Sequence, residues 1–260
     1  HLIPSLQRLA HKIAPGSTML RAWDLPGGMS AALTVFEVEL KQGERRKLIL
    51  RTRELAGLSV EDEFRTLGIL QRLGIAAPAP VLVDVSTELF PRPYLVLEYV
   101  EGEVDFAPAD PVSAARQMAR LLASLHTSDL TGLELACLPA NSAGLEVEAS
   151  GTPYGLSGLM HEGLIRAVLA SMPAPTWQRT VLLHGDFWPG NILWQADELA
   201  AVLDWEDASL GDPLADLAIA RLDLTCIFSL EAAQSFTREY LQLTGFDAAA
   251  LPYWDLCAVL

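Results

Sequence analysis

Cysteine is scarce in this chain, which has three among 260 residues, Cys137, Cys226 and Cys257. Their number is odd, and their spacing matches neither a disulfide framework nor a metal-binding motif. We therefore expect buried or idle thiols in a reducing compartment, and a cytoplasmic protein.

Basic residues are also few. There are 18 Lys and Arg against 33 Asp and Glu, which gives a formal net charge of −15. A strongly acidic chain is repelled by nucleic acids and by anionic membranes, so we expect neither as a partner. The same balance suits a cationic partner, although most of the excess is expected on ordinary solvated surface.

Long apolar runs, internal repeats and low-complexity linkers are absent. No run reaches the length that crosses a bilayer, and the first residues, HLIPSLQRLAHKIAPGS, do not form a signal peptide pattern. A chain of this length holds one or two domains with a sizeable core. The last residues, LPYWDLCAVL, are typical of a helix that is cut while still apolar, so we expect the natural chain to continue past Leu260.

The first hundred residues are strand-rich with one helix. A turn around Gly43 separates two β-branched runs, which predicts a hairpin. Helical spacing of apolar residues predicts a helix over 60–73, ended by Gly74. The predicted strands are 32–40, 47–53, 81–85 and 94–100.

Helical patterns dominate from Asp110, which can cap a helix that begins with Pro111. A Gly-, Ser- and Pro-rich loop is predicted over 138–158 and a helix near 159–172. Short strands at LLH and AVLD flank the segment described next, and the residues from Leu214 on are helical in character.

The segment LLHGDFWPGNILW carries the most information in the chain. It places His184, Asp186 and Asn191 in the order H-x-D-x-x-x-x-N, and the segment AVLDWED then places Asp204 after an apolar run. Phosphoryl transfer needs one carboxylate near the attacking hydroxyl and oxygen ligands for magnesium. Asp186 can serve the hydroxyl, while Asn191 and Asp204 can hold the metal.

Two other readings of these residues are weaker. The carboxylates of Asp186 and Asp204 also suit turns at strand ends. A hydrolytic metal site with His184 would need further ligands at regular spacing, and the sequence does not supply them.

Several segments together resemble the aminoglycoside phosphotransferase and choline kinase family. They are GGMSAALTVFEVEL, LILR, EDEFRTLGILQRLG, YLVLEYVEG, HGDFWPGNILW and VLDWEDASLGDPLADLA. The resemblance implies an α+β, protein-kinase-like fold of two lobes. A small antiparallel sheet with one helix would form a nucleotide-binding lobe over 1–98, and a mainly helical lobe would cover 99–260.

The resemblance also implies roles for single residues. Asp186 resembles the catalytic base, Asn191 and Asp204 the magnesium ligands, and His184 a structural member of the catalytic loop. The other positions carried over are Gly27, Gly28 and Ser30 for the loop over the phosphates, and Glu98 to Val100 for the hinge that meets adenine.

Two departures from protein kinases matter. Arg51 stands where they have Lys, and an arginine can contact phosphate and pair with a carboxylate. We expect Glu63 as that partner, with Glu61 as the alternative, and Arg53 is a competing candidate for the phosphate. Second, DWE replaces DFG and no activation-loop segment is present, which favours a small molecule over a protein as substrate.

Other positions keep two readings. Glu206 and Asp207 either line the acceptor site or are solvated, and Trp188 either stacks on a substrate ring or covers the loop. Asp216 is expected to hydrogen-bond the backbone of the catalytic loop, and His126 to be a packed histidine. Asp212-Pro213 is expected to be a turn and helix start.

The function predicted is ATP-dependent transfer of phosphate to a hydroxyl of a small molecule, with ATP and Mg²⁺ as cofactors. The acceptor class is an aminoglycoside-like antibiotic or an amino-alcohol or sugar metabolite, with some preference for a cation. The rival hypothesis is a catalytically silent nucleotide-binding protein of the same fold. The sequence does not set the acceptor, the choice between ATP and GTP, or the oligomeric state.

Overall fold

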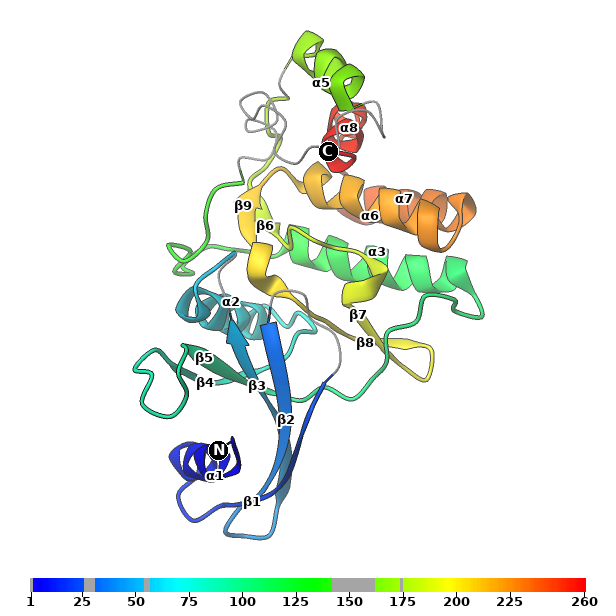
Figure 1. Ribbon diagram of the computed structural model, residues 1–260. Coiled ribbons are helices and arrows are strands. Elements are labelled where there is room, and N and C mark those ends of the chain that lie inside the picture. Colours follow the sequence, from blue (N-terminus) through cyan, green and yellow to red (C-terminus); the bar gives the residue numbers. More distant parts are fainter. Residues whose placement is uncertain (1, 26–30, 54–56, 142–161, 174) are drawn as a thin grey trace. The chain divides into compact units, whose positions relative to one another are not determined.

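The computed structural model describes residues 2–25, 31–53, 57–141, 162–173 and 175–260 (Figure 1). They form two compact units. The first holds His1–Glu101 and Ala201–Glu206, and the second holds Gly102–Ala200 and Asp207–Leu260. The assignment of nucleotide binding to 1–98 and of the acceptor to 99–260 stays a prediction.

The first unit is built on a five-stranded antiparallel sheet with the order β1-β2-β3-β5-β4. The strands are β1 Thr18–Asp24, β2 Ala31–Glu39, β3 Arg45–Arg53, β4 Pro80–Asp84 and β5 Tyr94–Glu98. The hairpin predicted around Gly43 is confirmed. Gly43 has a φ of +85°, and Phe36 of β2 faces Leu48 of β3.

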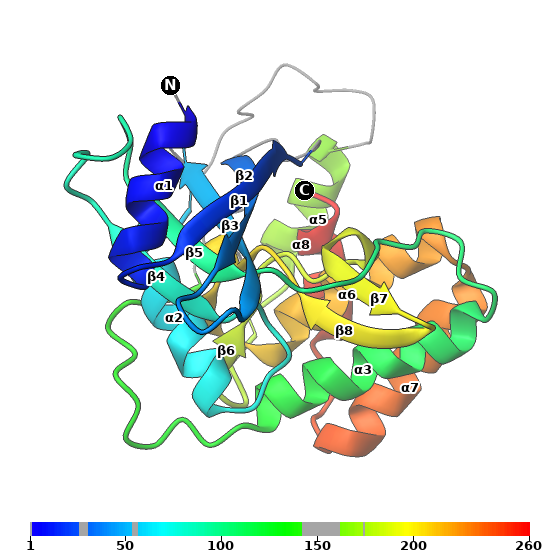
Figure 2. The same ribbon diagram turned by 90° about the horizontal axis from the view of Figure 1, so that it is seen from below.

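Two helices, α1 (Leu2–Ile13) and α2 (Val60–Arg72), pack on this sheet. Leu6 and Leu9 of α1 share a buried cluster with Phe36, Leu48 and Val96 on one face of the sheet. Alternate residues along a strand point to opposite faces, so Arg51 of β3 faces away from α1. Figure 2 shows strands of the sheet between α1 and α2.

Helix α1 and strand β1 were not predicted from the sequence, whereas α2 was. The buried residues of the helix, Leu6, Leu9 and Ala10, lie on one apolar stripe. With Leu2 and Ile13 they follow the i, i+3, i+4, i+7 spacing of an amphipathic helix, so the sequence carried a periodic signal here that the prediction overlooked. The apolar stripe packs on the sheet, and this burial stabilises the short helix.

A buried carboxylate fastens α1 to the sheet. Asp84 ends β4 and accepts hydrogen bonds from Lys12 of α1, from the Ser86 N–H at 2.7 Å and from the Tyr94 hydroxyl at 2.9 Å. These bonds, that from Lys12 foremost, hold the pKa of Asp84 well below its ordinary value. Because these three partners lie on separate segments, the Asp84 carboxylate links α1, the sheet and the turn that follows β4.

Helices pack against one another in the second unit, where α3 contacts α7, α7 contacts α6, and α8 contacts both α6 and α5 (Figure 1). The predicted start of α3 is confirmed, since the Asp110 carboxylate accepts a hydrogen bond from the Ser113 N–H at 2.9 Å. The helices are α3 Pro111–Thr127, α5 Glu162–Ser171, α6 Pro213–Ile227, α7 Leu230–Thr244 and α8 Leu251–Ala258.

Short strands carry the loops of interest. The strands are β6 Val181–Leu183, β7 Ile192–Gln195, β8 Glu198–Val202 and β9 Ser209–Gly211, with the 3-10 turns η1 Pro189–Asn191 and η2 Trp205–Asp207. Strand β6 pairs with β9, and β7 pairs with β8. The two strands predicted around the H-x-D segment correspond to β6 and β8, but they lie in two separate ladders. Their partners, β9 and β7, were not predicted.

None of the helices in the described ranges is long and apolar enough to cross a membrane. This agrees with the interrupted apolar runs of the sequence.

We predict that Asp84→Asn lowers the free energy of unfolding by about 2 kcal/mol at pH 7, because the buried network loses its negative charge and one of its two acceptor oxygens. The folded-state pKa of Asp84 is depressed below 3.8. The contribution is therefore fully present above that pH and is lost as the pH falls below it. Urea unfolding at several pH values measures the difference between the two proteins.

The matched control is Asp247→Asn, since Asp247 is an exposed turn carboxylate that accepts a hydrogen bond from the Ala249 N–H. Its effect should be small at every pH. A difference between wild type and Asp84→Asn that stays constant down to pH 2 would contradict the assigned role.

Candidate active site

The H-x-D-x-x-x-x-N segment folds into a tight loop between β6 and β7. Asn191 closes it, because its Nδ2 donates to the backbone oxygen of Asp186 at 2.9 Å and to Asp186 Oδ2 at 3.0 Å. The Asp186 N–H in turn donates to His184 Nδ1 at 3.1 Å. The loop thus brings Asp186 and Asn191 into direct contact, and His184 is a buried structural member of it.

Asp216 of α6 holds the start of this loop. Its Oδ2 accepts from the His184 N–H at 2.7 Å, and its Oδ1 accepts from the Gly185 N–H at 2.9 Å. The predicted contact between Asp216 and the loop backbone is therefore confirmed. A fully buried carboxylate that receives two backbone N–H groups fixes the direction in which the chain leaves β6.

His126 and Tyr240 complete the buried network. His126 Nε2 lies 3.2 Å from Asp216 Oδ2, and its Nδ1 lies 2.7 Å from the Tyr240 hydroxyl. Burial raises the pKa of Asp216, but the hydrogen bond and charge of His126 outweigh it, so the pKa is lowered overall. The packed role predicted for His126 is confirmed, and helices α3, α6 and α7 meet at this one group.

Gly185 occupies a crowded position with a φ of +88°. A Cβ there would lie 2.3 Å from the backbone oxygen of Asp207 and 2.8 Å from its Cβ. Backbone atoms cannot move aside as a flexible side chain can. The residue after His184 is therefore glycine for two reasons, its conformation and the close approach of the segment that follows DWE.

Trp188 packs inside the loop. Its ring lies so close to Gly190 that a Cβ on Gly190 would be 2.3 Å away, and it stacks on Phe106 with ring centroids 6.0 Å apart. The covering role is thus the one observed. Stacking on a substrate ring is not tested and stays a hypothesis.

In the first unit, three carboxylates converge on Arg51. Nη1 donates to Glu63 at 2.6 Å, and Nη2 donates to Asp204 at 2.6 Å and to Glu206 at 2.8 Å. Burial lowers the pKa of Arg51, but these carboxylates outweigh it and raise the pKa. Of the two glutamates considered, Glu63 is the buried one that pairs with Arg51, and Glu61 is exposed.

Asp204 has a left-handed backbone with a φ of +61°, which is uncommon for a residue with a side chain. Its side chain keeps 35% of its surface exposed, against 13% for Glu206. Glu206 was expected either to line the acceptor site or to be solvated. It is instead paired with Arg51, and its role toward an acceptor stays untested. Asp207 is exposed.

The remaining predicted positions have mixed outcomes. Gly27, Gly28 and Ser30 lie outside the described residues, as does the side chain of Arg53. Glu98 ends β5, pairs with Arg46, and donates its N–H to the Ala79 oxygen at 2.9 Å. Its backbone can thus offer a ligand only the carbonyl oxygen. Val100 follows outside the strand.

The sequence reading missed Asp223, which lies on α6 two turns after Asp216 and hence on the same face of that helix. Burial, and then the negative charge of Asp186, raise the pKa of Asp223. The charge of the loop's Asp186 therefore reaches a second carboxylate on α6. The seven-residue spacing from Asp216 was the signal that could have revealed it.

Comparison with known proteins agrees with this geometry. Residues 26–252 match the model of the phosphotransferase enzyme family. The chain belongs to that family. The predicted family and the prediction of a small-molecule phosphotransferase are confirmed.

Curated relatives of this phosphotransferase differ in how much they share with it. Viomycin phosphotransferase of Streptomyces vinaceus is 28% identical over 232 residues, which cover 84% of this chain and 78% of that protein. Acyl-CoA dehydrogenase family member 10 of Mus musculus is 28% identical over 197 residues, which cover 68% of this chain but 18% of that protein.

Solved structures show the same fold. The GDP complex of aminoglycoside 2′-phosphotransferase-IIIa aligns with a TM-score of 0.69 at 15% identity, over 99% of this chain and 88% of that one. A macrolide 2′-phosphotransferase of Brachybacterium faecium aligns with a TM-score of 0.64 at 20% identity, over 98% and 88%. The protein-kinase-like α+β fold predicted from the sequence is confirmed.

We predict that Gly185→Ala destabilises the phosphotransferase by about 3 kcal/mol or more, because the added Cβ meets backbone atoms. The control is Gly132→Ala. Gly132 has a comparable φ of +74° but nothing within 4 Å of its Cβ position. Its cost should be only the conformational one, about 1 kcal/mol. Thermal unfolding of both variants measures the difference, and equal melting temperatures would refute the steric argument.

We further predict that Asp216→Asn loosens the start of the catalytic loop, because an amide cannot accept all the bonds that the two carboxylate oxygens receive. Hydrogen exchange at the His184 and Gly185 amides should become at least about tenfold faster, as expected from losing a net 1.4 kcal/mol of protection. Tyr240→Phe, which touches only His126 in this network, should change these amides much less. Unchanged exchange in Asp216→Asn would contradict the anchoring role.

Proposed function

We propose that this phosphotransferase moves the γ-phosphate of ATP to a hydroxyl of a small molecule. The observation that carries the proposal is the closed loop in which Asn191 donates to Asp186 while Asp216 fixes the loop's first two amides. The acceptor oxygen would form a bond to the γ-phosphorus as the bond to the β–γ bridging oxygen breaks. The hydroxyl proton would pass to Asp186, and ADP would leave.

Asp186 is suited to this role by its orientation. Asn191 Nδ2 holds Oδ2, so the direction of the carboxylate is set before an acceptor arrives. A base must lie within hydrogen-bond reach of the proton it takes, and a fixed carboxylate meets that condition without reordering. Asp186 is half-buried, which leaves it reachable.

The donor set proposed for Mg²⁺ fits that ion. Asn191 turns its amide nitrogen to Asp186, which leaves the oxygen Oδ1 as its ligand atom, and Asp204 supplies a carboxylate. Carboxylate and amide oxygens are preferred by Mg²⁺. When bound, the ion would neutralise charge on the phosphates.

Arg51 is proposed to hold phosphate oxygens. To do so, its guanidinium must give up a hydrogen bond that it now makes to a carboxylate. Glu63 anchors Nη1, while Nη2 donates to both Asp204 and Glu206. A phosphate contact through Nη2 would exchange with one of those carboxylates. Where that carboxylate is Asp204, binding of the nucleotide would free it for the metal.

The proposed acceptor is a small hydroxyl compound, preferably cationic. Burial raises the pKa of Asp223 and the negative charge of Asp186 raises it further, so two carboxylates act close to the loop and favour a cation. The related proteins named above act, by their names, on viomycin, aminoglycosides and macrolides. Trp188, Glu206 and Asp207 stay candidates for the acceptor side, and the cytoplasm is the proposed location.

ADP or GDP release with Mg²⁺ tests the proposal, comparing no acceptor with viomycin, aminoglycosides, macrolides, choline and amino alcohols. We expect one class to stimulate turnover strongly. Asp186→Ala should lower that turnover by at least about a hundredfold while nucleotide binding persists. Asp129→Ala, at an exposed turn carboxylate of the second unit, is the control and should be unaffected.

Two results would count against the assignment. Full turnover in Asp186→Ala would remove its role as base. Nucleotide binding without stimulation by any acceptor would favour the catalytically silent rival.

A further inference from the structure

An exposed aromatic ring stands beside the proposed catalytic loop, within the second unit. Phe106 belongs to the segment that leads from β5 to α3, and 51% of its surface is exposed. It stacks on Trp188 of the loop, with ring centroids 6.0 Å apart and 30° between the ring planes. Single exposed apolar side chains are common, but this one joins a second ring that lies two residues from Asp186.

The segment that carries Phe106 is fixed to the strand that leaves the loop. Glu103 and Trp194 of β7 exchange two backbone hydrogen bonds, both of 2.9 Å. The Asp105 carboxylate then accepts the Ala107 N–H at 2.8 Å, which forms a tight turn with Phe106 at its centre. The backbone on both sides of the ring is therefore held in place before any ligand arrives.

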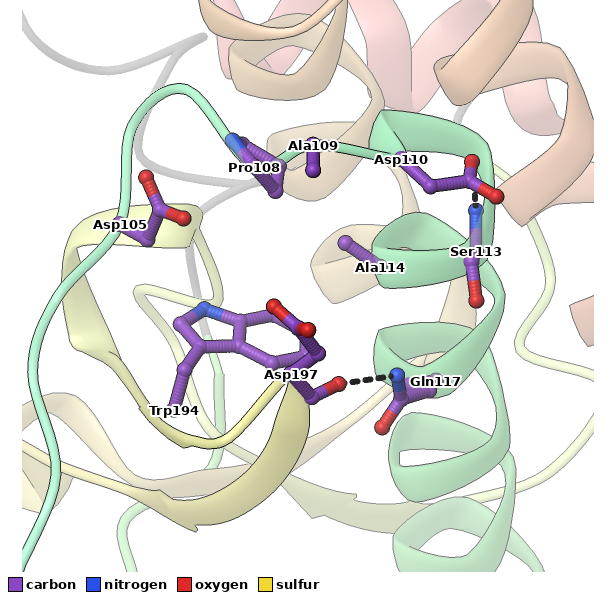
Figure 3. Close-up of a pocket in the computed structure, with 9 residues that line it drawn as sticks. All are labelled: Asp105, Pro108, Ala109, Asp110, Ser113, Ala114, Gln117, Trp194 and Asp197. Carbon is purple, nitrogen blue, oxygen red and sulfur yellow. Dashed lines mark hydrogen bonds between the residues drawn. The ribbon is translucent and has the colours of Figure 1, made fainter.

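The side chains of this turn point in two directions. Asp105 and Pro108 line a small pocket beside Trp194 (Figure 3). Phe106, which lies between them in the sequence, contacts Trp188 instead. The charged side chain therefore lies on the pocket side of the segment, and the aromatic ring lies on the side of the loop.

Trp188 and Asp186 share one side of the loop. Trp188 has an extended backbone, with a φ of −141° and a ψ of 165°. Successive side chains of an extended chain point to opposite sides. Burial follows this alternation, because Phe187 and Pro189 are buried whereas Asp186 and Trp188 are half-buried. The stacked rings are therefore on the same side of the loop as the carboxylate that is proposed to meet the acceptor hydroxyl.

We propose that Phe106, supported by Trp188, is a specificity-determining residue of the acceptor site and binds a flat apolar ring that the acceptor carries near its hydroxyl. This inference rests on the proposed function, since it takes Asp186 as the group that meets the hydroxyl. Contact between aromatic rings supplies attraction beyond the burial of apolar area. The exposed ring is a phenylalanine, whose face attracts a cation less than that of tryptophan, so the stack favours an aromatic ring over an ammonium group.

The first test follows the indole N–H of Trp188 by ¹⁵N–¹H NMR of the whole chain, with Trp188→Phe to assign the signal. Three probes separate the contributions: 2-phenylethanol has a flat ring and a hydroxyl, choline has a cation and a hydroxyl, and propane-1,2-diol has hydroxyls alone. We expect a saturable shift with 2-phenylethanol at millimolar concentration, and no saturation with the other two probes in the same range.

Phe106→Ala should weaken the binding of 2-phenylethanol by about fivefold, as expected for the loss of one aromatic pair, and Phe106→Tyr should keep it within about twofold. Leu243→Ala is the control, because Leu243 is a comparably exposed apolar side chain on α7, and it should bind as the wild type does. The proposal is overturned if 2-phenylethanol gives no saturable shift, if choline binds as tightly, or if Phe106→Ala binds as the wild type does.

Turnover separates this inference from the proposed function. With nucleotide and Mg²⁺, Phe106→Ala should raise the KM of a ring-bearing acceptor about fivefold with kcat nearly unchanged, and should leave the KM of acceptors without a ring as it is. If 2-phenylethanol binds but no acceptor stimulates turnover, the proposed function fails while the ring-binding role of Phe106 stands. Turnover with ringless acceptors alone, or an equal effect of Phe106→Ala on both kinds, would overturn the role in specificity.

Discussion

The carboxylate of Asp216 is the interaction on which the second unit depends. It receives the N–H groups of His184 and Gly185 and contacts His126, whose other ring nitrogen meets Tyr240. One buried charge therefore ties three helices to the loop that presents Asp186. Such a group is costly to desolvate, and only a full set of partners makes it stable. Because the partners come from distant segments, the shape of the loop depends on how α3, α6 and α7 pack.

In the first unit the buried charge that links distant segments is a cation. Arg51 lies on a central strand and is almost fully buried, and carboxylates from α2 and from the DWE segment share its guanidinium. The planar fork of an arginine can serve several carboxylates at once, whereas an ammonium group is a single point of charge. This offers a physical reason for arginine at a position where protein kinases have lysine. It also joins Ala201–Glu206, which is remote in sequence, to the sheet of the first unit.

Much of this could be predicted from the sequence, and the rest could not for definite reasons. The hairpin around Gly43, helix α2 and the cap at Asp110 follow from local patterns, which report turns, apolar stripes and caps directly. Asp216 was identified because it follows a recognisable motif. Helix α1 was overlooked although its apolar residues recur at helical spacing, whereas β7 and β9 were missed because strands of three or four residues leave almost no periodic signal. The engagement of Glu206 by Arg51 depends on tertiary contact, which no spacing encodes.

The contact between Gly185 and Asp207 has an evolutionary consequence. The two residues belong to different motifs, and their backbones meet with no room for a single added carbon. The two motifs therefore pack directly against each other, although the β7–β8 hairpin and its flanking turns separate them in the sequence. Drift in either motif is constrained by the other, so substitutions at these positions should be inherited as a pair among relatives. A chimera that takes the H-x-D loop from one relative and the DWED segment from another would inherit a mismatch at this point, even if each piece were functional in its parent.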